Sequence, residues 1–172
     1  MGKKNIILIG FMGCGKSTFG KKISKETEYT FIDMDTYIER KEGCSISEIF
    51  ATKGEEYFRQ LESNLVEKLS GEGGYVISTG GGVIKNPKNI EKFKENGVIV
   101  YLKSSPERIY RNVKNDTTRP LLAVEDKMAR ILELLKEREP LYKKYSDATV
   151  DVSKGSISNI TKQIISIMEE MV

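Results

Sequence analysis

The chain has 172 residues, of which 38% are hydrophobic and 31% charged, and its 28 basic and 25 acidic side chains give a net charge of +3. This length and balance predict one globular domain over residues 1–172 and exclude a disordered or fibrous protein. Because the basic excess is small and the lysines are scattered, we expect no nucleic-acid partner.

No segment approaches the roughly 18 apolar residues of a membrane span, and the apolar run at residues 6–9 is too short for a signal-peptide core. The two cysteines, Cys14 and Cys44, are too few for a disulfide framework or a zinc site. We therefore expect a cytoplasmic protein with reduced thiols and no membrane partner. Since the chain has no histidine, a general base must be a carboxylate, a lysine, a tyrosine or water.

Short apolar segments with β-branched residues alternate with segments of helical spacing. The first unit is a strand over residues 5–9, a glycine-containing loop and a helix over residues 16–25. Further strands are predicted at residues 75–78, 98–102 and 148–152, with a shorter candidate at Phe31 and Ile32. This alternation predicts an α/β fold with a parallel sheet covered by helices on both faces.

Two consecutive helices are predicted where the alternation is interrupted. Ser45 and Glu48 form a Ser-x-x-Glu capping box, and Gly54 offers a stop before a second helix. The apolar face of that second helix consists of Phe58, Leu61, Leu65 and Leu69. Such an insertion either carries a substrate site or simply packs against the core.

Another helix is predicted over residues 125–138, and Pro140 should close or kink it. The segment before it, residues 112–118, is polar and has no periodicity. We predict a mobile loop there.

The loop after the first strand is a candidate phosphate site. It reads Gly10-Phe11-Met12-Gly13-Cys14-Gly15-Lys16-Ser17, which fits G-x-x-x-x-G-K-[ST] in the required place between a strand and a helix. Its backbone N–H groups and the helix N-terminus should bind phosphates, Lys16 should contact the β- and γ-phosphates, and Ser17 should ligate Mg²⁺. The predicted nucleotide contacts here are Gly13, Cys14, Gly15, Lys16, Ser17 and Thr18.

Several separated motifs resemble one family, the shikimate kinases. They are Asp33-Met34-Asp35, Phe58-Arg59, Gly80-Gly81-Gly82, Arg119-Pro120-Leu121-Leu122 and Arg138-Glu139-Pro140-Leu141-Tyr142, in that family's order over nearly the whole chain. The resemblance implies a P-loop kinase fold, a three-layer α/β/α arrangement whose five-stranded parallel sheet has the strand order 2-3-1-4-5. It also implies a monomer with a helical shikimate-binding region over about 33–62, a lid over about 112–124, and ATP and shikimate as substrates.

The resemblance assigns the acceptor site to residues whose chemistry suits a carboxylated polyol. Arg59 and Arg138 are expected to bind the shikimate carboxylate. Asp35 is expected to bind the hydroxyls and accept the proton, and the backbone of Gly80, Gly81 and Gly82 to approach the substrate. From the residues alone, solvent-exposed helical arginines, N-capping aspartates and a plain glycine loop remain open.

The resemblance also assigns the metal and nucleotide contacts. Asp33 should belong to the Mg²⁺ shell, and because it lies two residues before Asp35 it should be on the same side of an extended segment. The third predicted strand has no Walker B acid, a departure that the family shares and that makes Asp33 more important for the metal. Arg119 should reach the transferring phosphate when the lid closes, which makes Lys16, Asp35 and Arg119 the catalytic residues. Arg111 is expected to stack on adenine.

Two alternatives stay open. A kinase for gluconate or for a nucleoside monophosphate would share the core, although Arg59, Arg138 and Asp35 suit a small carboxylated polyol better. A nucleotide-dependent switch without kinase activity is the other alternative, but the dipeptide Asn-Lys of the guanine-reading motif Asn-Lys-x-Asp does not occur in this chain.

Overall fold

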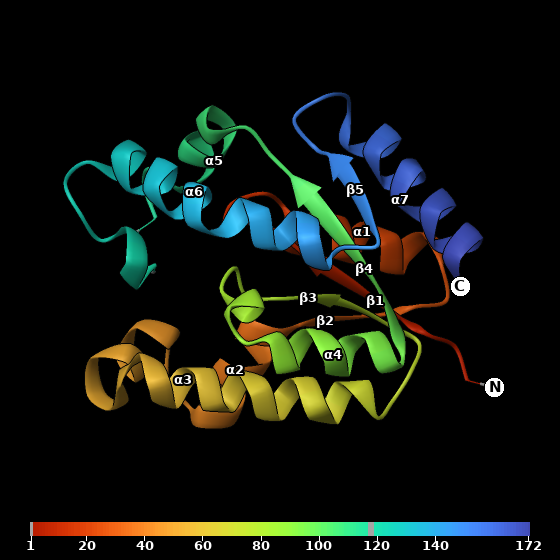
Figure 1. Ribbon diagram of the computed structural model, residues 1–172, viewed down its shortest axis with the longest axis horizontal. Helices are drawn as coiled ribbons and strands as arrows, with labels where there is room; N and C mark the ends of the chain where they lie inside the picture. Colours follow the sequence, from red (N-terminus) through yellow and green to blue (C-terminus); the bar gives the residue numbers. More distant parts are fainter. Residues whose placement is uncertain (1, 117–118) are drawn as a thin grey trace.

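The computed structural model describes residues 2–116 and 119–172. Its centre is a five-stranded sheet with all strand pairs parallel, in the order β2-β3-β1-β4-β5 (Figure 1). The strands are β1 Asn5–Ile9, β2 Thr30–Asp33, β3 Tyr75–Ser78, β4 Gly97–Lys103 and β5 Ala148–Asp151. The predicted strands and their order are confirmed, with small differences at the strand ends.

Helices connect the strands and cover both faces of the sheet. They are α1 Lys16–Glu26, α2 Met34–Glu42, α3 Ile46–Ser70, η1 Val83–Lys85, α4 Pro87–Glu95, α5 Pro106–Val113, η2 Pro120–Leu122, α6 Lys127–Tyr145 and α7 Ile157–Met171. Helices α1 and α7 pack on one face, and α2 to α6 pack on the other, so the three-layer arrangement is confirmed (Figure 1). None of the helices in the described part of the chain is both long and apolar enough to cross a membrane.

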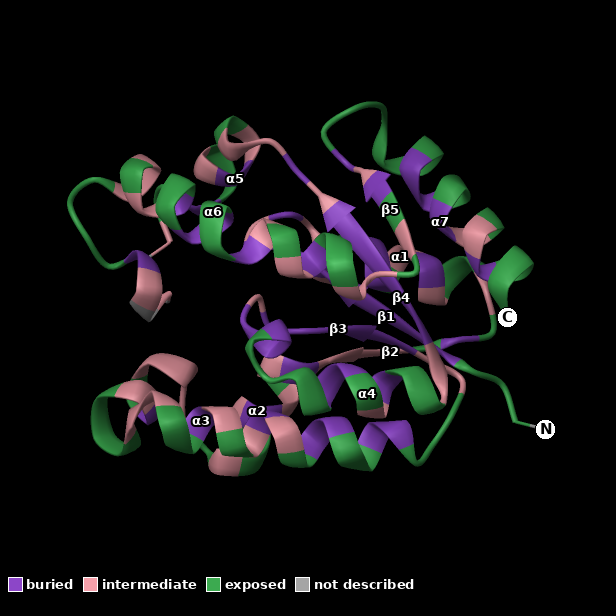
Figure 2. Ribbon diagram, viewed as in Figure 1, coloured by how far each residue is buried: buried purple, intermediate pink, exposed green. Residues whose placement is uncertain are grey.

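The central strand β1 shows how the sequence builds a core on each face. All of its residues are buried, with Ile7 and Ile9 in the core under α2 to α6 and Ile6 and Leu8 in the core under α1 and α7. Successive side chains of a strand point to opposite faces, so a strand covered on both sides needs a continuous apolar run. Figure 2 shows β1 buried throughout, whereas α4 and α7 are buried only on their inner sides.

The helix signals around α3 act as predicted. The Ser45 hydroxyl accepts a hydrogen bond from the N–H of Glu48 (3.1 Å) and caps the helix. Gly54 has φ 89° and ψ 166°, which interrupts α3 with a kink that a residue bearing a Cβ would resist. The second part of α3 then runs along the core with Phe58 and Leu65 buried.

Some local predictions were wrong. Of the two alternatives for Pro140, closing the helix was wrong, because α6 continues to Tyr145 and the fully buried Tyr142 packs its last turn against the core; a kink at Pro140 stays a prediction. Asn112 belongs to α5 and not to a loop. Asp35 lies in the first turn of α2, so it does not share an extended segment with Asp33.

Candidate active site

A cavity of about 940 Å³ lies at the carboxyl ends of β1, β2 and β3, the edge where parallel α/β sheets bind ligands. It brings together most of the predicted site residues, namely Gly13, Gly15, Lys16, Ser17, Thr18, Asp33, Asp35, Arg59, Gly80, Gly81, Gly82, Arg119 and Arg138. Two predicted residues do not line it. Cys14 is buried in the core under α1 and α7, and Arg111 is exposed.

The loop between β1 and α1 has the form of a phosphate cradle. Gly13 and Gly15 have φ values of 81° and 101°, in the left-handed region that glycine adopts without strain. The Lys16 ammonium donates hydrogen bonds to the carbonyl oxygens of Gly10 (2.7 Å) and Phe11 (3.2 Å), so it is held across the loop. A phosphate group bound here would meet a lysine, loop amides and the N-terminus of α1.

Side-chain oxygen atoms that could ligate a divalent cation lie beside this loop. The Ser17 hydroxyl donates to Oδ2 of Asp33 and lies 3.3 Å from the hydroxyl oxygen of Ser78. Oδ1 of Asp33 accepts from the N–H of Thr36 (3.1 Å) and caps α2. Because the two carboxylate oxygens are used separately, the capping and metal roles of Asp33 are compatible. One carboxylate and one hydroxyl fit Mg²⁺, which is completed in such sites by phosphates and water.

Arg138 is the unusual charge of the cavity. Its side chain is fully buried, and its Nε, Nη1 and Nη2 have no hydrogen-bond partner among the described residues. The centre of its guanidinium lies 5.8 Å from the centroid of the Phe11 ring. A buried cation without a partner carries a large desolvation cost, so this arrangement indicates a site built to receive an anion.

Arg59 presents a second guanidinium to the cavity. It donates to Oε1 of Glu62 and to Oε1 of Glu55 (3.1 Å each), while its Nε is buried without a partner among the described residues. Phe58, whose ring centroid lies 5.2 Å from this guanidinium, packs against Phe50 and adds an apolar wall. A carboxylate attached to a carbon ring suits such surroundings.

Two carboxylates line the same cavity, Glu62 buried and Asp35 partly exposed. Oδ1 of Asp35 has no hydrogen-bond partner among the described residues, and burial, reinforced by the charge of Asp33, raises the pKa of Asp35. Glu62 is 1% exposed, and burial raises its pKa to about 7 even though Arg59 acts in the opposite direction. Carboxylates with raised pKa values accept protons more readily near neutral pH.

Glu62 was not predicted as a site residue. A signal was present in the spacing, because Glu62 lies in the buried stripe of α3 between Phe58 and Leu65. A carboxylate in an otherwise apolar stripe indicates either a buried ion pair or a pocket, and here both are found.

The segment Gly80 to Gly82, called the glycine segment below, lets these charged groups approach the backbone. A Cβ on Gly80 would lie 2.8 Å from Oε2 of Glu62, and a Cβ on Gly82 would lie 2.6 Å from Nη2 of Arg59. Any larger residue would displace these side chains. The preceding Thr79 fixes the segment to β1, since its hydroxyl donates to a carbonyl oxygen of that strand (2.8 Å).

The segment between α5 and α6 brings Arg119 to the cavity, where its Nε donates to Oδ2 of Asp116 (3.1 Å). From α5, Asn112 lines the cavity, whereas Arg111 does not. Residues 117 and 118 of the predicted loop lie outside the described residues. The lid and the stacking of Arg111 on adenine therefore stay predictions.

Known proteins are similar to this chain in sequence and in fold. The family model for shikimate kinase matches residues 12–169. A shikimate kinase of Caldanaerobacter subterraneus subsp. tengcongensis is 51% identical over 162 residues, which cover 94% of this chain and 94% of that protein.

Solved structures agree with the sequence comparison. The shikimate kinase from Acinetobacter baumannii in complex with shikimate has a TM-score of 0.93 and 34% identity, covering 98% of this chain and 94% of that chain. A gluconokinase from Sinorhizobium meliloti has a TM-score of 0.62 at 18% identity, covering 99% of this chain and 93% of that chain, which shows a common fold alone. This chain therefore belongs to the shikimate kinase family.

Proposed function

We propose that this chain transfers the γ-phosphoryl group of ATP to the 3-hydroxyl of shikimate, giving shikimate 3-phosphate and ADP in chorismate and aromatic amino acid biosynthesis. The observation that carries this proposal is the guanidinium of Arg138, which is fully buried in the cavity and has no hydrogen-bond partner among the described residues. The carboxylate of an acid acceptor supplies the missing partner. Membership of the shikimate kinase family supports the choice of acid.

Two arginines hold the acid end of the acceptor in this proposal. Arg138 offers unpaired donors, and Arg59 is oriented by its hydrogen bonds to Glu55 and Glu62. Charge-assisted hydrogen bonds from two cations fix both the position and the direction of a carboxylate. The helical region over about 33–62 thus forms the acceptor site together with α6.

Asp35 acts on the hydroxyl end. Its carboxylate binds the acceptor hydroxyls and takes the proton from the attacking oxygen as the new phosphorus–oxygen bond forms. The raised pKa of Asp35, caused chiefly by burial, supports this role because a base with a pKa closer to neutral pH takes up a proton more readily.

The nucleotide end uses the loop between β1 and α1. Gly13, Gly15, Lys16, Ser17 and Thr18, which line the cavity, bind the phosphates of ATP. Mg²⁺, held through Ser17 and Asp33, neutralises charge on the phosphates when it is bound.

Arg119 stabilises the transferring group from the other side. It already lines the cavity, and the lid over about 112–124 brings it closer to the phosphates when the lid closes. Closure also keeps water from the phosphoryl group, which limits hydrolysis of ATP without an acceptor.

We also propose a single domain over residues 1–172 that works as a monomer in the cytoplasm, without nucleic-acid or membrane partners. Cys14 and Cys44 are free thiols, which supports a reducing compartment. One chain supplies both the phosphate loop and the buried arginines, which supports a site that needs no second copy.

A coupled assay of ADP release tests the proposed function. Purified protein with ATP and Mg²⁺ is given shikimate, gluconate, AMP or no acceptor, and the product is identified by phosphorus NMR. We expect release with shikimate alone and phosphate on the 3-hydroxyl. Release with gluconate or AMP but not with shikimate would contradict the proposal, and equal release in every reaction would favour a nucleotide switch.

A further inference from the structure

Tyr142 contacts the glycine segment from α6 and has no role in the mechanism described so far. Its side chain is fully buried, and its hydroxyl donates a hydrogen bond to the carbonyl oxygen of Gly81. Tyr142 lies one helical turn after Arg138, so the same face of α6 presents both a guanidinium and a phenol to this segment.

The backbone carbonyl oxygens of Gly80 to Gly82 accept hydrogen bonds from the protein, whereas the backbone N–H groups of these glycines do not find acceptors among the described residues. The carbonyl oxygen of Gly80 accepts from the N–H of Val83 and that of Gly82 accepts from the N–H of Lys85 (3.1 Å each). Tyr142 completes the set by binding the carbonyl oxygen of Gly81. Within residues 2–116 and 119–172, no acceptor is found for the amide N–H groups of these three glycines.

This division leaves the segment with free donors beside the cavity. Buried or partly buried N–H groups are nearly always paired, so unpaired ones at the wall of a cavity indicate oxygen atoms of a ligand. Because each carbonyl is held by the protein itself, the peptide planes are fixed before the ligand arrives. Of the three hydrogen bonds that hold them, the one from Tyr142 alone comes from outside the segment and η1.

The packing of Tyr142 keeps its hydroxyl in place. The ring stacks on Tyr101 with a centroid distance of 5.1 Å and an interplanar angle of 15°, and neither ring is more than 2% exposed. Burial raises the pKa of Tyr142, so the phenol stays protonated and remains a donor. A rigid side chain of this kind can transmit the position of α6 to the glycine backbone.

The glycine backbone in turn sets the spacing of the charged groups. A Cβ on Gly81 would lie 3.3 Å from Nη1 of Arg138, which shows how closely the guanidinium approaches the segment. A shift of the peptide at Gly81 would therefore move the free N–H groups relative to Arg138. Both should contact the same small acceptor.

We propose that Tyr142 is a positioning residue for the acceptor substrate, acting through its hydrogen bond to the carbonyl oxygen of Gly81. The bond fixes the orientation in which the segment offers its N–H groups to oxygen atoms of the acceptor. This inference rests on the proposed function, because it assumes that shikimate binds between Arg138 and the glycine segment. It predicts a larger effect on acceptor binding than on ATP binding, since within the described residues Tyr142 makes no hydrogen bond to the loop between β1 and α1 and that loop meets Gly81 through packing alone.

The test compares Tyr142→Phe with Tyr101→Phe. Each variant loses one hydroxyl from the same buried stack, but in the described part of the chain the Tyr101 hydroxyl makes no hydrogen bond to the glycine segment. For Tyr142→Phe we expect the KM for shikimate to rise about threefold to tenfold, which corresponds to the loss of one hydrogen bond. The KM for ATP should stay within about twofold of the wild-type value by the same reasoning.

The outcomes separate this inference from the proposed function. A rise in the shikimate KM for Tyr142→Phe alone supports the positioning role, and calorimetric binding of shikimate without ATP should show the same loss. Equal changes in both tyrosine variants, a matching rise in the ATP KM, or no change at all would overturn it. If Arg138→Met raises the shikimate KM while Tyr142→Phe does not, the inference fails and the proposed function stands. If the wild-type chain does not phosphorylate shikimate, both fail.

Discussion

Asn5 at the amino edge of the sheet and Arg138 at the carboxyl edge are both buried, but of the two only Asn5 has its hydrogen bonds made within the described part of the chain. At the amino edge, Asn5 is 1% exposed, yet its side-chain amide donates to the carbonyl oxygens of Leu69 and Glu72 and accepts from the N–H of Tyr75 (3.0 Å each). At the carboxyl edge, Arg138 is just as buried and has no hydrogen-bond partner among the described residues.

This difference distinguishes buried polar side chains that stabilise the fold from buried polar side chains that bind ligands. A buried polar group with all its hydrogen bonds ties neighbouring elements together, whereas an unpaired one lowers stability. Among the described side chains with buried unpaired atoms, the charged ones, Asp35, Arg59 and Arg138, all line one cavity, where substrates can supply partners. Changes at the carboxyl edge should therefore affect catalysis more than stability, and changes at the amino edge should do the reverse.

The largest effect on catalysis is expected for Asp35→Asn, which keeps the size of the side chain and removes its proton-accepting carboxylate. We expect kcat to fall by roughly 10²–10⁴-fold, the usual contribution of a general base. Affinity for ATP, measured by calorimetry, should be retained because Asp35 is assigned to the acceptor. A kcat close to the wild-type value would remove Asp35 from the proposed mechanism.

The next largest effect is expected for Arg138→Met, which replaces the unpaired cation by an apolar side chain. We expect kcat/KM for shikimate to fall by roughly 10²–10³-fold, as for the loss of one partner of a buried charge pair. The melting temperature without substrate should stay the same or rise, because no hydrogen bond is lost and a desolvated charge is removed.

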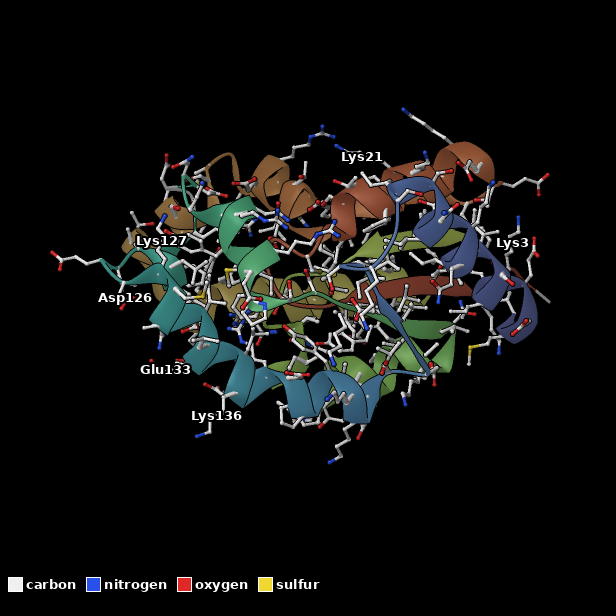
Figure 3. The ribbon with its side chains drawn as sticks, turned by 90° about the horizontal axis from the view of Figure 1, so that it is seen from above. Lys3, Lys21, Asp126, Lys127, Glu133 and Lys136 are labelled. Atoms are coloured by element: carbon white, nitrogen blue, oxygen red, sulfur yellow. The ribbon has the colours of Figure 1, made fainter. Side chains whose placement is uncertain are left out.

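Lys136→Met is the matched control on the same helix. Lys136 is exposed, and Figure 3 shows its side chain pointing from α6 into solvent. Its removal should leave both activity and melting temperature close to wild type. If Arg138→Met instead unfolded the protein while Lys136→Met did not, Arg138 would be holding the fold, and the contrast between the two edges would be wrong.

The amino edge should respond in the opposite way to Asn5→Leu. This change removes three buried hydrogen bonds and leaves the N–H of Tyr75 without its acceptor, while the two carbonyl oxygens keep other donors, so we expect the free energy of unfolding to fall by about 3 kcal/mol. The KM values for ATP and shikimate should not change. Urea unfolding and the coupled assay measure the two effects. Asn64→Leu serves as the control, because Asn64 is exposed and bonds Gln60 on the surface of α3.

The sequence predicts the features of this molecule that depend on local patterns. The apolar run of β1 predicts a central strand, and the Gly10 to Ser17 motif predicts a phosphate loop, because both signals lie within a few consecutive residues. The strand order and the convergence of Arg59 and Arg138 depend on contacts between distant segments. Only the resemblance to a family could supply them.

The sequence did not predict a role for side chains whose function depends on contacts between distant segments. Tyr142 appears in a family motif, but nothing in the sequence shows that its hydroxyl meets the carbonyl of Gly81. The spacing of Glu62 places it in the apolar stripe of α3, but its burial beside Arg59 depends on the packing of α3 in the fold. Pro140 likewise suggests the end of a helix, because the packing that extends α6 beyond it comes from other elements.

Glu62 allows the contrast to be tested by titration. Burial raises its pKa from 4.5 to about 7, so between these values the folded state binds the proton more tightly than the unfolded state. The Glu62 contribution to the free energy of unfolding therefore falls as pH rises through this interval. Glu62→Gln removes that contribution, so in urea unfolding across a pH series the free energy of unfolding of the variant should rise relative to that of wild type by about 2–3 kcal/mol from acid to neutral pH.

Glu55→Gln is the matched control, with the smallest effect and the opposite sign. Burial pushes the pKa of Glu55 upward, but its contacts with Arg59 and Lys85 outweigh burial and the pKa is lowered. Its stabilising contribution is present above the unfolded pKa and is lost as pH falls through the lowered folded value. The free energy of unfolding of Glu55→Gln should therefore fall slightly relative to that of wild type as the pH rises from acid to neutral. Both carboxylates contact Arg59, but only Glu62 is fully buried. Equal pH dependence in the two variants would therefore mean that burial does not change the pKa of the carboxylate.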